Sequence, residues 1–292
     1  MRFSASWRVQ RLRRLEHGAA GTRHLLSRIE AGEAVDIAPP ASSDGDWRVL
    51  GVTGAPGVGK SCLVDRLVAA WVAAGQTVAV LAVDPSSAIS GGALLGDRLR
   101  MESVHSDSVY MRSIATRSMR GGLPARLGKM VDACLAAGWD RVIIETVGAG
   151  QAELAITAEA DRLLLVEGPS RGDVIQAEKA GILELADVIA VNKSDLAGAA
   201  QAADEIRIAL QLSESSQPVV LCSAQTEEGI SSLLEALDSL PTGRIQALAR
   251  ARQRLFNQAI ENLCTHPAFG DVLKSLAAGD IDVAQALRHL GE

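Results

Sequence analysis

The chain has 292 residues, and 48% of them are hydrophobic, which is enough for one large domain with a sizeable core. Its formal net charge of −6 argues against a general nucleic-acid-binding protein. No apolar stretch is long enough for a secretory signal or a membrane span, so we expect no membrane association and a cytoplasmic protein.

The N-terminal segment is rich in arginine. Ahead of the first acidic residue, Glu16, lie Arg2, Arg8, Arg11, Arg13 and Arg14. Such a segment is either a disordered or helical tail or a short organelle-targeting leader, and we favour the tail. A helical pattern follows over residues 18–36, and the sequence IAPPASSDGD after it is typical of a linker.

The region from Trp47 to residue 222 alternates short β-branched runs with longer helical stretches. The expected strands span residues 47–53, 77–83, 141–146, 162–167, 187–192 and 218–222. This alternation predicts an α/β fold, with a mostly parallel, doubly wound sheet and functional residues where strands end. We therefore divide the chain into an N-terminal tail and helical extension (1–44), a central domain (45–240) and a C-terminal helical arm (241–292).

The segment GVTGAPGVGKSCLV, residues 51–64, matches the pattern G-x-x-x-x-G-K-[ST] between a predicted strand and a predicted helix. Glycines let backbone N–H groups close around an anionic phosphate, and the following helix adds its positive end. Lys60 would supply charge to the β- and γ-phosphates and act in catalysis. The predicted phosphate-binding set is Gly54, Gly57, Val58, Gly59, Lys60, Ser61 and Cys62. The alternative is a glycine-rich turn between core elements.

Acidic residues follow two further strands. Asp84 ends the second expected strand, Asp97 lies in the loop after it, and Glu145 ends the third expected strand. Mg²⁺ prefers oxygen ligands and retained waters, so these carboxylates and the Ser61 hydroxyl are the predicted magnesium ligands. Glu145 also has a predicted catalytic role. Gly148 lies where a backbone N–H can meet a γ-phosphate.

The sequence VIAVNKSDLAG contains the pattern N-K-x-D at Asn192, Lys193 and Asp195. Guanine presents N1–H and a 2-amino group side by side, and one carboxylate can accept from both, so Asp195 would select guanine over adenine. Asn192 would tie this segment to the phosphate loop, and the Lys193 stem would cover a ring face. Ser223 and Ala224 could present a backbone N–H to guanine O6. The alternative is a strand followed by a capped helix; we favour GTP and GDP as ligands.

The four cysteines, Cys62, Cys134, Cys222 and Cys264, are far apart in the sequence and have apolar neighbours. We predict buried free thiols in a reducing compartment. Cys264 is close to His266, but no second pair of ligands accompanies them, so we predict no metal site there.

Together these motifs resemble the MeaB/ArgK-type G proteins, which are chaperones of adenosylcobalamin-dependent acyl-CoA mutases such as methylmalonyl-CoA mutase. The stretches that carry the resemblance are GAPGVGKS, LAVDPSSAISGGALLGDRLRM, IIETVGAGQAE, GILELADVIAVNKSD and LKSLAAGDIDVAQALRHL. The resemblance implies a GTPase that protects a mutase and gates its cofactor loading. It also implies that Asp84, Asp97 and Glu145 are acids of the Mg²⁺ site, and that the C-terminal arm holds a homodimer.

By the same resemblance, Lys179 lies in a partner-responsive switch segment. The hypothesis is that hydrolysis is slow in the isolated protein and that the mutase accelerates it, with Lys179 supplying charge to the nucleotide site or to the interface. A solvated loop before a helix is the alternative. Two stretches in expected switch regions depart from the family pattern: RSIATRSMRGG and VEGPSRGDVIQ.

Three other functions are compatible with a phosphate loop. A GTPase for nickel insertion into hydrogenase or urease should contain clustered Cys or His ligands, whereas the histidines here are dispersed. A metabolic kinase would need no guanine selector, and a pure protein-interaction module would leave the phosphate loop without a purpose. We therefore favour the mutase-associated GTPase.

Overall fold

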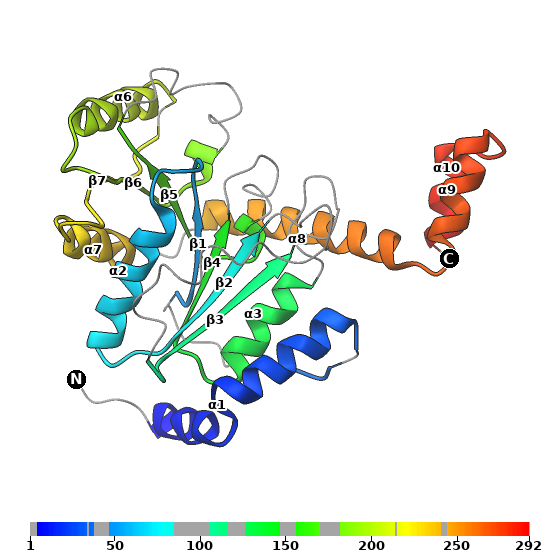
Figure 1. Ribbon diagram of the computed structural model, residues 1–292. Helices are drawn as coiled ribbons and strands as arrows, with labels where there is room; N and C mark the ends of the chain where they lie inside the picture. The colour runs from blue at the N-terminus through cyan, green and yellow to red at the C-terminus, as the bar shows by residue number, and fades with distance from the viewer. Residues whose placement is uncertain are drawn as a thin grey trace.

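The computed structural model describes residues 5–33, 35–37, 47–84, 106–115, 126–146, 156–169, 182–213, 215–240 and 244–291. Its centre is a seven-stranded sheet in the order β3-β2-β4-β1-β5-β6-β7, with every neighbouring pair parallel (Figure 1). The strands are β1 (Val49–Thr53), β2 (Val78–Asp84), β3 (Val109–Ala115), β4 (Arg141–Thr146), β5 (Arg162–Glu167), β6 (Val188–Val191) and β7 (Val219–Leu221). The α/β prediction is confirmed, and the described sheet is parallel throughout.

Helices cover both faces of this sheet. The helices of the described residues are α1 (Ala5–Ala31), α2 (Lys60–Ala73), α3 (Leu127–Ala136), α6 (Ala199–Leu212), α7 (Ile230–Ser239), α8 (Arg244–Thr265), α9 (Phe269–Ala278) and α10 (Val283–Gly291), with a short 3-10 helix η3 (Ile156–Ala158). One apolar core joins α1, α3 and α6 to the sheet, and a second joins α2 and α7 to it. There are two cores because successive side chains of a strand point to opposite faces of the sheet. Along β4, for example, Ile144 belongs to the first core and Ile143 to the second.

The six expected strands are all present, but the edge strand β3 was not predicted. Its residues alternate between the two cores, with Tyr110 in the first and Met111 in the second. Arg112 interrupts the apolar pattern because its guanidinium leaves the sheet and bonds to α1: it lies 2.5 Å from Glu30 Oε2 and donates to Ser27 Oγ at 3.0 Å. An edge strand beside a helix tolerates such a residue better than a central strand does.

The N-terminal helix α1 begins before the predicted residue 18 and is kinked at Gly18, where φ is 45°. Its second half packs on the sheet through Leu26 and Ile29, which are buried. The Trp139 indole N–H donates to Thr22 Oγ1 at 3.0 Å, and this hydroxyl in turn donates to the Gly18 carbonyl at 3.1 Å. The predicted helical extension therefore forms an integral part of the first core.

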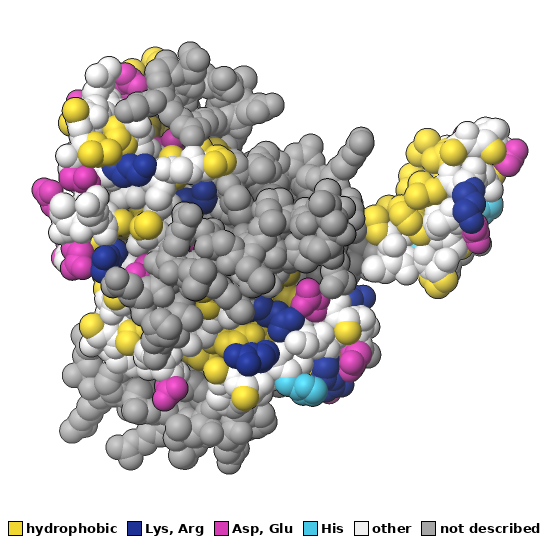
Figure 2. Space-filling view, viewed as in Figure 1, with side chains coloured by type: hydrophobic (Ala, Val, Ile, Leu, Met, Phe, Trp, Pro, Cys, Tyr) yellow, Lys and Arg dark blue, Asp and Glu magenta, His cyan; other side chains and the backbone are white. Residues whose placement is uncertain are grey.

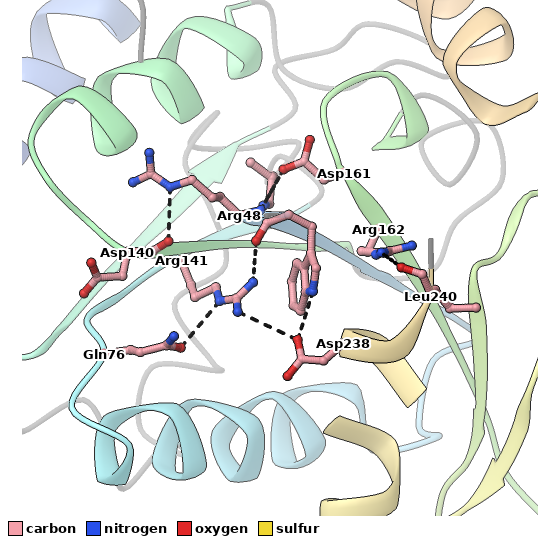
Figure 3. A network of polar contacts seen from close by, with 10 residues as sticks. Arg48, Gln76, Asp140, Arg141, Asp161, Arg162, Asp238 and Leu240 are labelled. Atoms are coloured by element: carbon pink, nitrogen blue, oxygen red, sulfur yellow. Dashed lines mark hydrogen bonds and ion pairs between the residues drawn. The ribbon is translucent and has the colours of Figure 1, made fainter. Parts of the chain in front are cut away.

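A polar network fixes the amino ends of β1 and β4, at the edge of the sheet opposite the strand ends that carry the motifs (Figure 3). The Arg141 guanidinium lies 3.9 Å from the Trp47 ring centroid and 3.8 Å from Asp238 Oδ1, which also accepts the Trp47 indole N–H at 2.9 Å. Arg162 donates to the carbonyl of Leu240 (Figure 3). These contacts hold the end of α7 against the start of the central strands.

The C-terminal helices extend away from the sheet. Helix α8 passes beside η3, and the α9–α10 pair stands apart from the body of the molecule (Figure 1). Figure 2 shows hydrophobic side chains gathered on this pair of helices, whose exposed large apolar residues are Leu273, Val283 and Leu287. Such an uncovered apolar surface is typical of a site of association.

The prediction of four buried thiols is only partly correct. Cys134 and Cys222 are buried, and burial raises the pKa of each thiol to about 12. Cys264 is intermediate, and Cys62 is exposed. Helix α2 buries Leu63, Leu67 and other residues at helical spacing, and Cys62 lies outside that stripe.

Candidate functional site

The phosphate-loop motif connects β1, which ends at Thr53, to α2, which begins at Lys60. Gly54 has a φ of 141°, and a Cβ atom at this position would lie only 2.0 Å from the Val166 carbonyl oxygen of β5. Gly59, the residue before α2, has a left-handed φ of 92°. The loop backbone therefore turns closely against the sheet in a conformation that only glycine adopts without strain at Gly54.

Lys60 directs its ammonium group back over the loop. Its side chain is buried, and Nζ donates to the carbonyls of Gly54 at 2.8 Å and Ala55 at 3.1 Å. A cation is thus held over a glycine-rich turn at the start of a helix, where backbone N–H groups are available to an anion. This arrangement fits a bound phosphate group.

Ser61 lies beside the predicted acidic residue of β4. The Ser61 hydroxyl donates to Glu145 Oε1 at 2.7 Å, and Glu145 is 6% exposed. The pair arises because β1 and β4 are neighbours, with Val52 opposite Glu145 in the register. A hydroxyl and a carboxylate at this distance form a donor set that suits Mg²⁺, which prefers oxygen ligands.

Four predicted site residues lie wholly or partly outside the described residues. Asp84 is the last residue of β2, so its backbone lies at the same edge of the sheet, but its side chain is outside the described part of the structure. Asp97, Gly148 and Lys179 lie outside the described residues altogether. Their roles stay predictions.

Asn192 connects the phosphate loop to the segments that follow β6 and β7. This side chain is 1% exposed, and its Nδ2 donates to the Val58 carbonyl at 2.9 Å. Its Oδ1 accepts the backbone N–H of Ala224 at 3.0 Å. The contact that the sequence predicted between Asn192 and the phosphate loop is present, and the same side chain also holds the loop after β7.

The remaining residues of the N-K-x-D motif lie beside Asn192 and contact the phosphate loop and the loop after β7. Lys193 has a φ of 63°, and its Nζ donates to the Gly57 carbonyl at 2.8 Å, so its stem runs along the loop. The Ser223 hydroxyl donates to Asp195 Oδ1 at 2.5 Å, which fixes one carboxylate oxygen. Ser223 is fully buried and orients Asp195 through its side chain, a contact that the sequence did not predict.

Backbone hydrogen bonds at the ends of β6 and β7 also hold the N-K-x-D segment and the loop after β7 together. The Cys222 carbonyl accepts the N–H of Ser194 at 2.9 Å, and the Cys222 N–H donates to the Val191 carbonyl at 3.0 Å. Arg66 of α2 donates to the Ala224 carbonyl at 2.9 Å. Sequence spacing places Arg66 on the same helix as Lys60, but it gives no indication of which loop the side chain meets.

The fold and this edge of the sheet define a P-loop nucleotide-binding protein of the α/β class. Residues 28–275 match the family described as "Methylmalonyl Co-A mutase-associated GTPase MeaB", and the chain belongs to this family. It is therefore a GTPase-family protein, and GTP is the nucleotide that its family membership implies.

Two relatives illustrate the family, and one solved structure illustrates the fold. The chain is 32% identical to GTPase ArgK of Escherichia coli over 276 residues, covering 87% of this chain and 81% of the relative. It is 39% identical over 240 residues to the Fused isobutyryl-CoA mutase of Nocardia farcinica, covering 75% of this chain but only 22% of that protein. A crystal structure of the LAO/AO transport system kinase has a TM-score of 0.60 at 24% identity, covering 100% of this chain and 98% of that one. At this identity the last comparison shows the fold alone.

The described residues lack two other kinds of feature. They contain no group of three or more His, Cys, Asp or Glu side chains placed to hold a metal ion. In the described part of the chain, no helix has the length and apolar character that a membrane crossing requires.

Proposed function

We propose that this chain binds and hydrolyses GTP with Mg²⁺ at the phosphate loop and that Asp195 selects guanine. The observation that carries the proposal is the position of Asn192, which contacts Val58 in the phosphate loop and Ala224 after β7. One buried side chain thereby holds the phosphate-binding and base-binding segments at a fixed separation. A nucleotide requires that spacing because its phosphates and its base are joined covalently.

The residues of the phosphate side have distinct roles in this proposal. The loop from Gly54 to Cys62 presents N–H groups, and Lys60 exchanges its contacts with Gly54 and Ala55 for the β- and γ-phosphates. Ser61 and Glu145, with Asp84 and Asp97, hold Mg²⁺, which neutralises charge on the phosphate oxygens. Gly148 donates its N–H to the γ-phosphate.

On the base side, Asp195 accepts N1–H and the 2-amino group of guanine through the carboxylate that Ser223 orients. The Lys193 stem covers one ring face. The Ala224 N–H, which donates to Asn192 Oδ1 in the structure, must be shared or reoriented if it is also to meet guanine O6. Adenine offers neither donor, so the Asp195 carboxylate would lose both contacts to the base and keep only the Ser223 hydrogen bond, at a cost of about 1 to 3 kcal/mol.

The partner is an adenosylcobalamin-dependent acyl-CoA mutase. Two findings support this part of the proposal: the family is named for its association with methylmalonyl-CoA mutase, and a fused isobutyryl-CoA mutase contains a region similar to this chain. We infer that the GTPase protects the mutase and gates its cofactor loading, that hydrolysis is slow without it, and that Lys179 takes part in the acceleration. The 45–240 segment forms the GTPase domain, with 1–44 and 241–292 as helical extensions.

A homodimer formed through the C-terminal arm is part of the same proposal. The exposed apolar residues Leu255, Phe256 and Ile260 of α8, with those of α9 and α10, form the surface that a second copy would cover. Sedimentation equilibrium measures this directly. A dimer that becomes a monomer in a Leu287→Glu variant supports the arm as the interface, and a wild-type monomer contradicts it.

Nucleotide titration tests the binding proposal. With Mg²⁺ present, the protein should bind GDP and GTP more tightly than ADP and ATP, and equal affinities would contradict guanine selection. Co-purification from the native cell then separates the two candidate partners. Recovery of a cobalamin-dependent mutase supports the proposed role, whereas recovery of a hydrogenase or urease would replace it by nickel insertion.

A further inference from the structure

Arg66 connects the helix that begins at the phosphate loop to the loop that follows β7. Its Nε donates to the Ala224 carbonyl at 2.9 Å, and its Nη1 lies 3.1 Å from Glu227 Oε1. Ala224 also donates its N–H to Asn192. Both backbone groups of this residue are therefore held by side chains, one from α2 and one from the N-K-x-D segment.

The hydrogen bond to Ala224 is the stronger of the two Arg66 contacts. The side chains of Arg66 and Glu227 are 31% and 66% exposed, so water screens their ion pair and its contribution to stability is small. The carbonyl belongs to Ala224, a buried residue, and a buried carbonyl needs a donor. A charged donor makes a shorter and stronger bond than a neutral one.

The position of Ala224 affects the Asp195 carboxylate through Ser223. Ser223 precedes Ala224 in the chain, donates its hydroxyl to Asp195 Oδ1 and accepts the N–H of Thr226 at 3.1 Å. If the Ala224 carbonyl loses its donor, the loop gains alternative positions and the Ser223 hydroxyl moves with it. The carboxylate oxygen that Ser223 holds then loses its fixed direction.

We propose that Arg66 is a positioning residue for guanine selection: it anchors the loop that orients Asp195 to the helix that begins at the phosphate loop. This inference rests on the proposed function, in which Asp195 reads the base. Arg66 itself touches neither the base nor the phosphates in this proposal. It acts by keeping the base-reading carboxylate at a fixed place relative to the phosphate loop.

Calorimetric titrations with Mg²⁺ and GDP, IDP or ADP test the proposal in wild type and in Arg66→Met. The matched control is Arg207→Met: Arg207 pairs with Asp204 at 2.8 Å and donates to the Val219 carbonyl at 3.2 Å, at the other end of β7. We expect Arg66→Met to lower the preference for GDP over ADP about tenfold, because a hydrogen bond to a charged group is lost. The preference for GDP over IDP, which lacks the 2-amino group, should fall as well, and Arg207→Met should change neither ratio.

The titrations distinguish a failure of the proposed guanine selection from a failure of the proposed role of Arg66. A wild type without preference for GDP over ADP refutes the proposed guanine selection itself. A wild type with that preference, together with unchanged ratios in Arg66→Met or equal losses in both variants, overturns the role of Arg66. If thermal melting shows that Arg66→Met is unfolded, Arg66→Lys and Arg207→Lys are compared by the same criterion, because lysine keeps the charge but cannot make the same forked contact.

Discussion

Replacing Gly54 by alanine should destabilise the protein far more than the same replacement at Gly57. At Gly54 the backbone φ is 141°, and the new Cβ would lie 2.0 Å from the Val166 carbonyl oxygen, a backbone atom that no side-chain rotation can move. At Gly57 the φ is 80°, and a Cβ would meet nothing within 4 Å. Both variants incur backbone strain, but only Gly54→Ala also forces the loop and β5 apart.

Backbone strain alone, and strain combined with a steric clash, lower the free energy of unfolding by different amounts. Strain in a sparsely populated region of backbone dihedral angles costs about 1 to 3 kcal/mol, and overpacking costs about the same. Gly54→Ala should therefore lower the free energy of unfolding by about 4 kcal/mol. Gly57→Ala should lose about 1 kcal/mol, the cost of the left-handed conformation. Chemical denaturation of the nucleotide-free protein measures both values, and the GDP affinity of Gly54→Ala should fall as well. Losses that agree within about 0.5 kcal/mol would refute the close approach of Gly54 to β5.

Four further predictions concern individual side chains. Asp195→Asn should weaken GDP binding and shift the preference toward xanthine nucleotides, whose 2-oxo group suits an amide donor; a retained guanine preference in titrations would contradict this. Lys60→Ala should lower GTP turnover about a hundredfold to a thousandfold, and near-normal turnover would show that the loop is structural. Maleimide should label exposed Cys62 at pH 8 but not Cys134 or Cys222, whose pKa burial raises to about 12. Because the folded state raises the pKa of these two thiols, their contribution to the free energy of unfolding is complete below the unfolded-state pKa of about 8.5. This contribution is lost as the pH rises toward 12, and alkaline denaturation measures the loss.

Much of the fold and the placement of the motifs could be predicted because they depend on local patterns. The run before Gly54 and the run before Asn192 are apolar because both strands are buried on two faces. Parallel strands bring their carboxyl ends to one edge of a sheet, so the contact between Asn192 and the phosphate loop followed from the order of the elements. The Ser61–Glu145 contact has the same origin, since β1, which leads into the phosphate loop before Ser61, is the neighbour of β4, which carries Glu145.

Other features depend on contacts that local patterns do not encode. Strand β3 was missed because Arg112 bonds to α1, which lies far away in the sequence. Arg66 was missed because helical periodicity indicates which face of α2 is buried, but it does not indicate which loop a side chain on another face contacts. The exposure of Cys62 could have been predicted: the buried stripe of α2 follows helical spacing through Leu63 and Leu67 and leaves Cys62 outside it.

We propose that GTP hydrolysis by this chain serves an adenosylcobalamin-dependent acyl-CoA mutase. The most direct test is the steady-state rate of GTP hydrolysis with and without such a mutase, in wild type and in Lys179→Ala. We expect a slow rate for the protein alone, a clear increase with the mutase and a smaller increase in the variant. An increase that is unchanged in Lys179→Ala would remove this lysine from the mechanism, and the absence of any increase with candidate mutases would contradict the proposed service to a mutase.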